Sequence, residues 1–335
     1  MDLIRTDRYG NEIAYMQNVD VDFEISSAGD SKSLNDFTVD INRDDWQHGI
    51  SEGCRVFAPD TEYGGIIGTI ETSTAENRIS ISGYTWRGMM DHKIIRPADG
   101  ADYATETGEL NAIIKARVES SFPGLFIGSD ETTGVYVDEF QYDRYCTLHE
   151  GLTDLLKSKG YKLDIKYIQG NPNEAGYVAV KAVRIVDYSD DVEFSQDSDF
   201  DFTSTQKRNG TNHLICLGSG ELAEREVIDL YVDGSGNVGT EQFYFGSDEI
   251  TDKYDSNGSS TEDLMENGKK KLQEDMNSES YGISISNIDT DIDIGDIVGG
   301  SDFITGITIK KPIGRKIWSI SAGQEKIEYK LEGDS

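Results

Sequence analysis

Strict alternation of apolar and polar side chains near both ends of the chain is the feature that most limits its possible folds. Val19, Val21, Phe23 and Ile25 alternate with acidic residues, and residues 37–41 repeat the pattern. A period of two is typical of strands that bury one face. Further strand-like segments lie at 55–57, 65–70, 78–83, 281–285, 296–298, 304–309, 316–320 and 326–331. The sequence therefore predicts β structure in both terminal regions.

The two terminal regions also resemble each other, segment by segment. The strand at 37–41 matches 281–285, Gly65-Ile-Ile matches Gly306-Ile-Thr, and 80–83 matches 319–323. These matches keep their order at an offset of roughly 240 residues, as expected of an internal repeat. We therefore expect two similar small β-barrels per chain, with Gly65 overlying Gly306. The second barrel would combine about 200–220 with 280–335.

Helical periodicity interrupts the β pattern between these regions. Residues 110–118 place their apolar side chains on one helix face, and Thr147 with Glu150 forms a capping box that opens a second helix. A third helix is predicted from Thr261 to about Met276. The predicted fold class is mainly β with inserted α+β domains. The predicted divisions are a first barrel at 1–98, an α+β insertion at 99–186, an acidic connector with a return strand at 187–221, a smaller insertion with a helix at 222–280, and a second barrel at 281–335.

The charge balance excludes several classes of function. The 335 residues include 31 Lys or Arg and 63 Asp or Glu, which gives a net charge of −32. Such a protein repels DNA and anionic membranes, so we expect no specific nucleic-acid binding and no direct membrane insertion. The sequence has no run of 18 apolar residues, and its first residues lack the basic and apolar regions of a signal peptide. We expect a protein made and kept in a cytoplasm.

Three acidic or polar stretches invite comparison with calcium loops. Seven carboxylates and no base lie between residues 187 and 201, a pattern that favours a solvated connecting segment. Residues 253–258 resemble part of an EF-hand loop, but Lys occupies the first ligand position and Leu264 the position of the bidentate Glu. In 289–293 the pattern fails because Ile294 stands where the loop needs Gly. We expect no calcium site.

The cysteines do not predict a disulfide framework. Cys54, Cys146 and Cys216 are far apart and odd in number. Cys146 with His149, and His213 with Cys216, supply the composition of a tetrahedral zinc site. However, positions three apart on a strand point to opposite faces, so His213 and Cys216 should not bind one ion. We predict no metal site and no cofactor.

No catalytic signature occurs in the sequence. Nucleophile elbows, Walker loops, dinucleotide fingerprints and metalloprotease motifs are missing from it. A carboxylate pair of a glycoside hydrolase stays open because acidic residues are so numerous, but no pair stands out. We therefore predict no catalytic residues.

Two further groups of side chains have both a structural and a functional interpretation. Trp46, Trp86 and Trp318 could form a carbohydrate-binding face, although packing explains the last two, near matching ends of the proposed barrels. The run 269–271 contains three lysines and is interpreted as a solvated helix face. Its functional alternative is a contact with an acidic neighbouring chain.

Three stretches taken together resemble the hub proteins of long-tailed bacteriophages and prophages. They are 81–97, 212–225 with 229–233, and 293–299. Each is moderately specific, and their combination in this order is more so. The resemblance covers essentially the whole chain and is strongest to the tail-tip hubs of phages of Gram-positive bacteria, a siphovirus minor tail protein type.

The resemblance implies a structural virion protein at the tail tip or baseplate, assembled in the host bacterial cytoplasm. A homotrimer would form a pseudo-sixfold ring that joins the tail tube or distal tail protein to a three-fold tip or spike protein. The acidic lumen would repel DNA in transit. Many related hubs continue into a lytic or host-binding extension, whereas this chain ends at Ser335, so no enzymatic activity is expected. The alternative is a carbohydrate-binding or receptor-binding β protein of a phage tail, and a less favoured one is a glycoside hydrolase.

Overall fold

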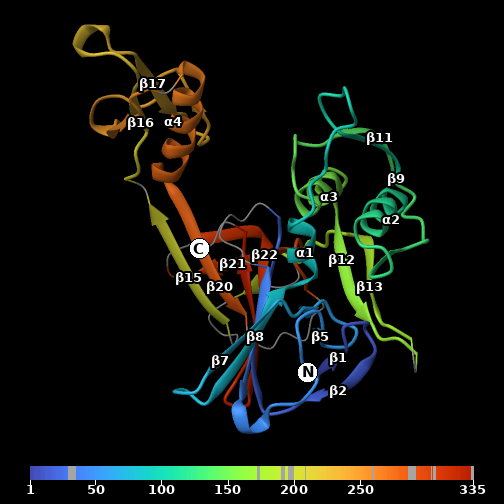
Figure 1. Ribbon diagram of the computed structural model, residues 1–335. Helices are drawn as coiled ribbons and strands as arrows, with labels where there is room; N and C mark the ends of the chain where they lie inside the picture. Colours follow the sequence, from blue (N-terminus) through green and yellow to red (C-terminus); the bar gives the residue numbers. More distant parts are fainter. Residues whose placement is uncertain are drawn as a thin grey trace. The chain divides into compact units, whose positions relative to one another are not determined.

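The chain divides into two compact units. The computed structural model describes residues 1–28, 35–171, 174–189, 193–194, 200–207, 209–258, 260–285, 292–302, 304 and 307–332 (Figure 1). The larger unit comprises Met1–Phe202 and Gly282–Ser335, and the smaller unit comprises Thr203–Tyr281. The division of the sequence into five parts stays a prediction.

The largest sheet of the larger unit joins strands from both ends of the chain. Its strands are β3 (Val19–Ser26), β4 (Asp36–Asn42), β7 (Thr69–Ser73), β8 (Arg78–Tyr84), β14 (Glu193–Phe194), β21 (Ile297–Asp302), β22 (Ile307–Ser321) and β23 (Gln324–Leu331). Their order is β14, β21, β22, β3, β4, β8, β7, and β23 also pairs with β22. The two ends of the chain meet where β3 and β22 run antiparallel, from Ser26 opposite Arg315 to Val21 opposite Ile320.

This continuous sheet corrects the expectation of two separate barrels. Strands of both proposed copies pair within one sheet, and none of the sheets in the described ranges closes on itself. Alternation shows which face of a strand is buried, but not which strand lies next to it. Moreover, β22 is one strand of 15 residues, where the sequence predicted two. Gly306, the expected counterpart of Gly65, lies outside the described residues.

The predicted alternation is confirmed by burial. Val21, Phe23 and Ile25 of β3 are buried, as are the apolar side chains of β4. The Phe23 ring stacks on Phe37 of β4 at a centroid distance of 5.0 Å, and on Trp318 of β22 at 5.5 Å. Stacked aromatic rings stabilise the packing beyond the effect of their buried area. This cluster therefore stabilises the contact of β3 and β4 with β22.

A second sheet of the larger unit contains the remaining N-terminal strands. They are β1 (Leu3–Thr6), β2 (Glu12–Met16), β5 (Arg55–Phe57) and β6 (Gly64–Ile66). Their order is β2, β1, β5, β6, so β2 is an edge strand. The 3-10 turn at Arg43–Asp45 follows β4.

The middle of the chain forms the α+β part of the larger unit. Its elements are α1 (Trp86–Asp91), β9 (Thr105–Glu109), α2 (Leu110–Ser121), β10 (Phe126–Gly128), β11 (Tyr136–Gln141), α3 (Leu148–Lys157), β12 (Tyr161–Ile168) and β13 (Tyr177–Arg184). The strands β10, β13 and β12 form a mixed sheet, and β9 pairs with β11. Helix α2 packs on β13 and α3 on β12 (Figure 1).

The two longer helices of this part follow their sequence signals. The predicted apolar face of α2 is buried. The capping box of α3 is confirmed, because the Thr147 hydroxyl accepts from Glu150 N at 3.0 Å and the Glu150 carboxylate accepts from Thr147 N at 2.8 Å. These bonds satisfy amides that the first helical turn leaves unpaired.

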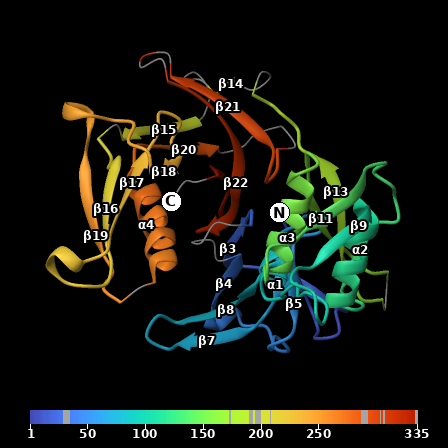
Figure 2. The same ribbon diagram turned by 90° about the horizontal axis from the view of Figure 1, so that it is seen from above.

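The smaller unit packs one helix on a four-stranded sheet. The strands are β16 (His213–Leu217), β17 (Val227–Val232), β18 (Val238–Gly239) and β19 (Thr251–Asp255), and the helix is α4 (Thr261–Asp275). The sheet order is β18, β17, β16, β19, with α4 against β16 and β17 (Figure 2). The predicted third helix is confirmed, but the return strand β16 pairs inside this unit instead of with the C-terminal strands. Short 3-10 turns lie at Leu222–Glu224 and Gly246–Asp248.

The polypeptide passes between the units along two strands, β15 (Phe200–Lys207) and β20 (Ser278–Ile285), which pair with each other. The acidic segment 187–201, expected to be a solvated connection, contains β14 and the start of β15.

Among the helices that the structure describes, none has the length and apolar character needed to cross a bilayer.

Candidate functional site

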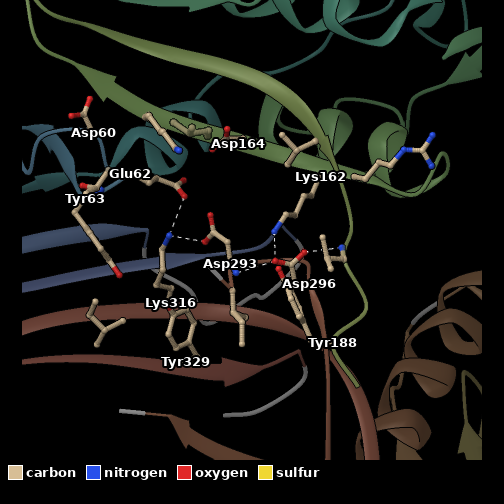
Figure 3. Close-up of a pocket in the computed structure, with 18 of the residues that line it drawn as sticks. Asp60, Glu62, Tyr63, Lys162, Asp164, Tyr188, Asp293, Asp296, Lys316 and Tyr329 are labelled. Carbon is tan, nitrogen blue, oxygen red and sulfur yellow. Dashed lines mark hydrogen bonds and ion pairs between the residues drawn. The ribbon is translucent and has the colours of Figure 1, made fainter. Parts of the chain in front are cut away.

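A cavity of about 490 Å³ in the larger unit is lined by segments far apart in the sequence. These segments are 60–63, the pair β12 and β13, and residues 292–296 with β22 and β23. Figure 3 shows charged side chains from all of them gathered at this cavity. The charged and phenolic residues of the lining include Asp60, Glu62, Tyr63, Lys162, Asp164, Tyr188, Asp293, Asp296, Lys316 and Tyr329.

Two local structures fix Glu62, which lines the cavity, and its ion-pair partner Arg87. Before β6, the Thr61 hydroxyl donates to Ala58 O at 2.8 Å and accepts from Tyr63 N at 3.1 Å, which sets the turn that carries Glu62. Arg87 lies in the first turn of α1, which is capped by Thr85. The Thr85 hydroxyl also donates to Asn35 O at 2.8 Å. The turn and the helix end therefore hold Glu62 and Arg87 in fixed positions.

Ion pairs connect these elements to β22. Arg87 Nε lies 2.5 Å from Glu62 Oε1, and Arg87 Nη2 donates to Glu62 Oε2 at 3.2 Å. Lys316 Nζ lies 2.6 Å from Asp293 Oδ1 and 3.7 Å from Glu62 Oε2. The Glu62 and Arg87 side chains are only 2% and 3% exposed. Glu62 thus attracts both Arg87 and Lys316 in a region where little water screens the charges.

A further ion pair extends the network to β12. Lys162 Nζ lies 2.6 Å from Asp296 Oδ2. The buried Asp296 carboxylate also accepts from Val186 N at 2.9 Å and from Asp293 N at 3.0 Å. A buried carboxylate needs several such donors to offset its desolvation. We define the ion network as three cations, Arg87, Lys162 and Lys316, and three carboxylates, Glu62, Asp293 and Asp296.

The pKa values of Asp293 and Lys316 favour the charged forms of these two side chains. Burial alone would raise the pKa of Asp293. Attraction to Lys316 and to Arg87, together with the hydrogen bond from Lys316, has the larger combined effect and lowers this pKa to about 2. Burial lowers the pKa of Lys316, but the combined attraction to Asp293, Tyr63 and Glu62 outweighs burial and leaves that pKa raised. A general acid needs a carboxyl whose pKa is raised towards the working pH. Asp293 is therefore suited to holding strands together and not to donating a proton.

The four candidate zinc ligands fall in two pairs, one in each unit. His149 is buried in α3, and its Nδ1 lies 2.8 Å from Asp91 Oδ1. In β16 the burial pattern places His213 and Cys216 on opposite faces, as the strand spacing predicted. In the ranges that the structure describes, no group of three or more His, Cys, Asp or Glu is arranged to hold a metal ion. That the protein binds no zinc stays a prediction.

The surroundings of the candidate tryptophans and of the lysine run 269–271 favour their structural interpretation. Trp86 and Trp318 are fully buried, so they belong to the core and not to a carbohydrate-binding face, and Trp46 is half-buried. In α4, Lys270 pairs with Glu266 and Lys271 with Asp275, each at 2.8 Å and one helical turn away. Such pairs are typical of a solvated helix face.

The ion network was not anticipated from the sequence. A signal for it exists, because Lys316 precedes Trp318 by two positions and therefore shares its face of β22. A buried Trp318 draws that lysine into the interior, and a buried lysine requires carboxylates nearby. The sequence does not show that Glu62 and Asp293 supply them, since both are remote from Lys316 in the sequence.

The fold is similar to that of a solved tail protein. The tail protein from Neisseria meningitidis MC58 aligns with 99% of this chain and 96% of its own length, at a TM-score of 0.50 and 14% identity. The 43 kDa tail protein of prophage MuSo2 from Shewanella oneidensis aligns with 99% of this chain and 98% of its own, at 0.49 and 13%. Prophage tail protein gp18 from Listeria monocytogenes EGD-e aligns with 100% and 96%, at 0.47 and 11%.

The likeness to the Neisseria protein confirms the expected resemblance at the level of the fold. No protein-family model and no curated protein matches the sequence. At 14% identity the likeness concerns the fold alone, and the hub subtype stays a prediction.

Proposed function

We propose that this protein is a structural subunit of a phage tail or baseplate and acts there as a trimeric hub. The observation that carries the proposal is the shared fold with the Neisseria tail protein, which extends over 99% of this chain. The hub would join a six-fold tail tube or distal tail protein to a three-fold tip or spike. It would be assembled in the host bacterial cytoplasm and would have no catalytic activity.

The open sheets suggest how a ring would form. The edge strand β2 exposes Ile13 and Tyr15, which are 52% and 56% accessible. Edge strands with exposed apolar side chains tend to pair with other chains. In a trimer, such edges would complete sheets across subunit boundaries, and the expected pair of barrels would then be a property of the ring and not of one subunit.

The charge supports a channel role within this proposal. A net charge of −32 would give the lumen of a trimer a negative potential. A negative wall repels the DNA backbone and prevents adsorption during passage. Solubility alone is the competing reason for this charge.

Mass photometry of the purified protein tests the trimer. We expect a species of three times the 37.1 kDa monomer mass and a loss of that species on Tyr15→Lys, because an ammonium would be buried at the β2 edge. Tyr136→Lys is the matched control, since Tyr136 is also an exposed strand residue, 67% accessible, but lies on β11. A monomer mass at every concentration would contradict the trimer, and equal effects of both variants would contradict the β2 interface.

A further inference from the structure

Three Asn-Gly pairs occur in the sequence, and all of them lie in the smaller unit. They are Asn209-Gly210, Asn257-Gly258 and Asn267-Gly268. Glycine has no side chain to hinder its backbone nitrogen, so this nitrogen can attack the preceding Asn side chain if the backbone can rotate. All three asparagines are exposed. Exposure of the asparagine therefore does not distinguish the three pairs. Any difference in reactivity must come from the surroundings of each glycine.

Two of the glycines are held in place. Gly210 is buried, its N–H donates to Asn277 Oδ1 at 2.9 Å, and a Cβ there would lie 2.2 Å from the Met276 carbonyl carbon. Gly268 lies inside α4, where its N–H belongs to the helical hydrogen bonds. A Cβ at Gly268 would lie 2.5 Å from Cys216 Sγ. Neither amide can turn toward its asparagine unless the unit opens locally.

Among the described residues, nothing restrains the third glycine in this way. Gly258 is exposed in the turn between β19 and α4, with a φ of +97°, and a Cβ there would meet nothing within 4 Å. Within the described part of the molecule, no hydrogen bond engages its N–H or the Asn257 side chain. Among the described residues, neither a hydrogen bond nor a close neighbour therefore hinders the approach of the attacking nitrogen to its target.

We propose that Asn257 is a site of spontaneous deamidation and that the fold protects Asn209 and Asn267 from the same reaction. The Gly258 nitrogen bonds to Asn257 Cγ, the bond between Cγ and Nδ2 of the same asparagine breaks, and ammonia leaves with the proton that the backbone nitrogen gives up. Water then opens the succinimide at either carbonyl. The products are aspartate and isoaspartate, each with one added negative charge at neutral pH.

The position limits the consequences for the fold. The new carboxylate would stand just before the N-terminus of α4, where Ser260 is the N-cap and Glu262 and Asp263 already occupy the first turn. Anions are favoured at helix N-termini. The aspartate product should leave α4 intact, whereas isoaspartate lengthens the backbone of the turn by one methylene.

Peptide mapping by mass spectrometry after incubation of the full-length protein at neutral pH tests the proposal. We expect Asn257 to convert at least about tenfold faster than Asn209 and Asn267, which corresponds to about 1.4 kcal/mol of local opening free energy. In urea, where the fold is lost, the three rates should approach one another. That control separates protection by the structure from differences in neighbouring residues.

A variant adds a second, independent readout. Asn277→Ala removes the acceptor of the Gly210 N–H, so conversion of Asn209 should rise while that of Asn267 stays unchanged. The proposal is overturned if Asn209 or Asn267 reacts as fast as Asn257 in the native protein. It is also overturned if Asn257 stays intact while the urea-unfolded protein reacts.

Discussion

The ion network of the larger unit and the lysine pairs of α4 show similar distances in opposite surroundings. Lys316 Nζ and Asp293 Oδ1 are 2.6 Å apart, with side chains 9% and 31% exposed. Lys270 Nζ and Glu266 Oε1 are 2.8 Å apart, with side chains 66% and 69% exposed. Water and salt screen the second pair. In the first pair, the buried lysine has lost most of its hydration and is stabilised by neighbouring carboxylates instead. Distance alone therefore does not measure what an ion pair contributes.

The largest expected effect comes from breaking the ion network. Lys316→Met should lower the free energy of unfolding of the larger unit by about 3 kcal/mol, because the buried Glu62 and the partly buried Asp293 lose the cation that they share. Denaturation followed by tryptophan fluorescence measures this, since Trp46, Trp86 and Trp318 all lie in the larger unit.

A double variant distinguishes loss of charge pairing from loss of packing. Lys316→Met with Asp293→Leu removes both charges and should be less destabilised than the sum of the single changes, by about 0.5–3 kcal/mol. Strict additivity would show that the two side chains do not interact in solution, and burial would then not explain the comparison with α4.

The sequence predicts the faces of the elements better than their neighbours. Alternation identified the buried side of β3, and the capping box identified the start of α3, because both signals are local. The pairing of β3 with β22 has no local signal, since strand partners are chosen over the whole sequence. The same holds for the ion network. The position of Lys316 beside Trp318 hints at burial, but its partners come from the turn at 58–63 and from residue 293.

Acid should weaken the ion network in a defined window. The pKa of Asp293 is lowered from 3.8 to about 2 because attraction to Lys316 and Arg87 outweighs burial. A lowered pKa in the folded state means that stabilisation is complete above the unfolded value, 3.8, and is lost as the pH falls through about 2.

The test compares the unmodified protein with Asp293→Asn, which has no carboxylate to titrate at this position. Their difference in unfolding free energy, measured by tryptophan fluorescence, should shrink between about pH 5 and about pH 2. A gap that stays constant over this window would mean that Asp293 is not the titrating group.

The smallest effect is expected in α4 itself. Lys270→Met should leave the hydrogen exchange of the α4 amides unchanged within error, because the pair with Glu266 is solvated and the helix keeps Leu264 and Leu272 buried against its sheet. Leu272→Ala in the same helix shows that the measurement is sensitive, since truncation of a buried leucine costs about 2–5 kcal/mol and should accelerate exchange strongly. If Lys270→Met instead destabilises the smaller unit as much as Lys316→Met destabilises the larger one, exposure does not decide the strength of these pairs. The lysines at 269–271 would then stabilise the smaller unit despite their exposure to solvent.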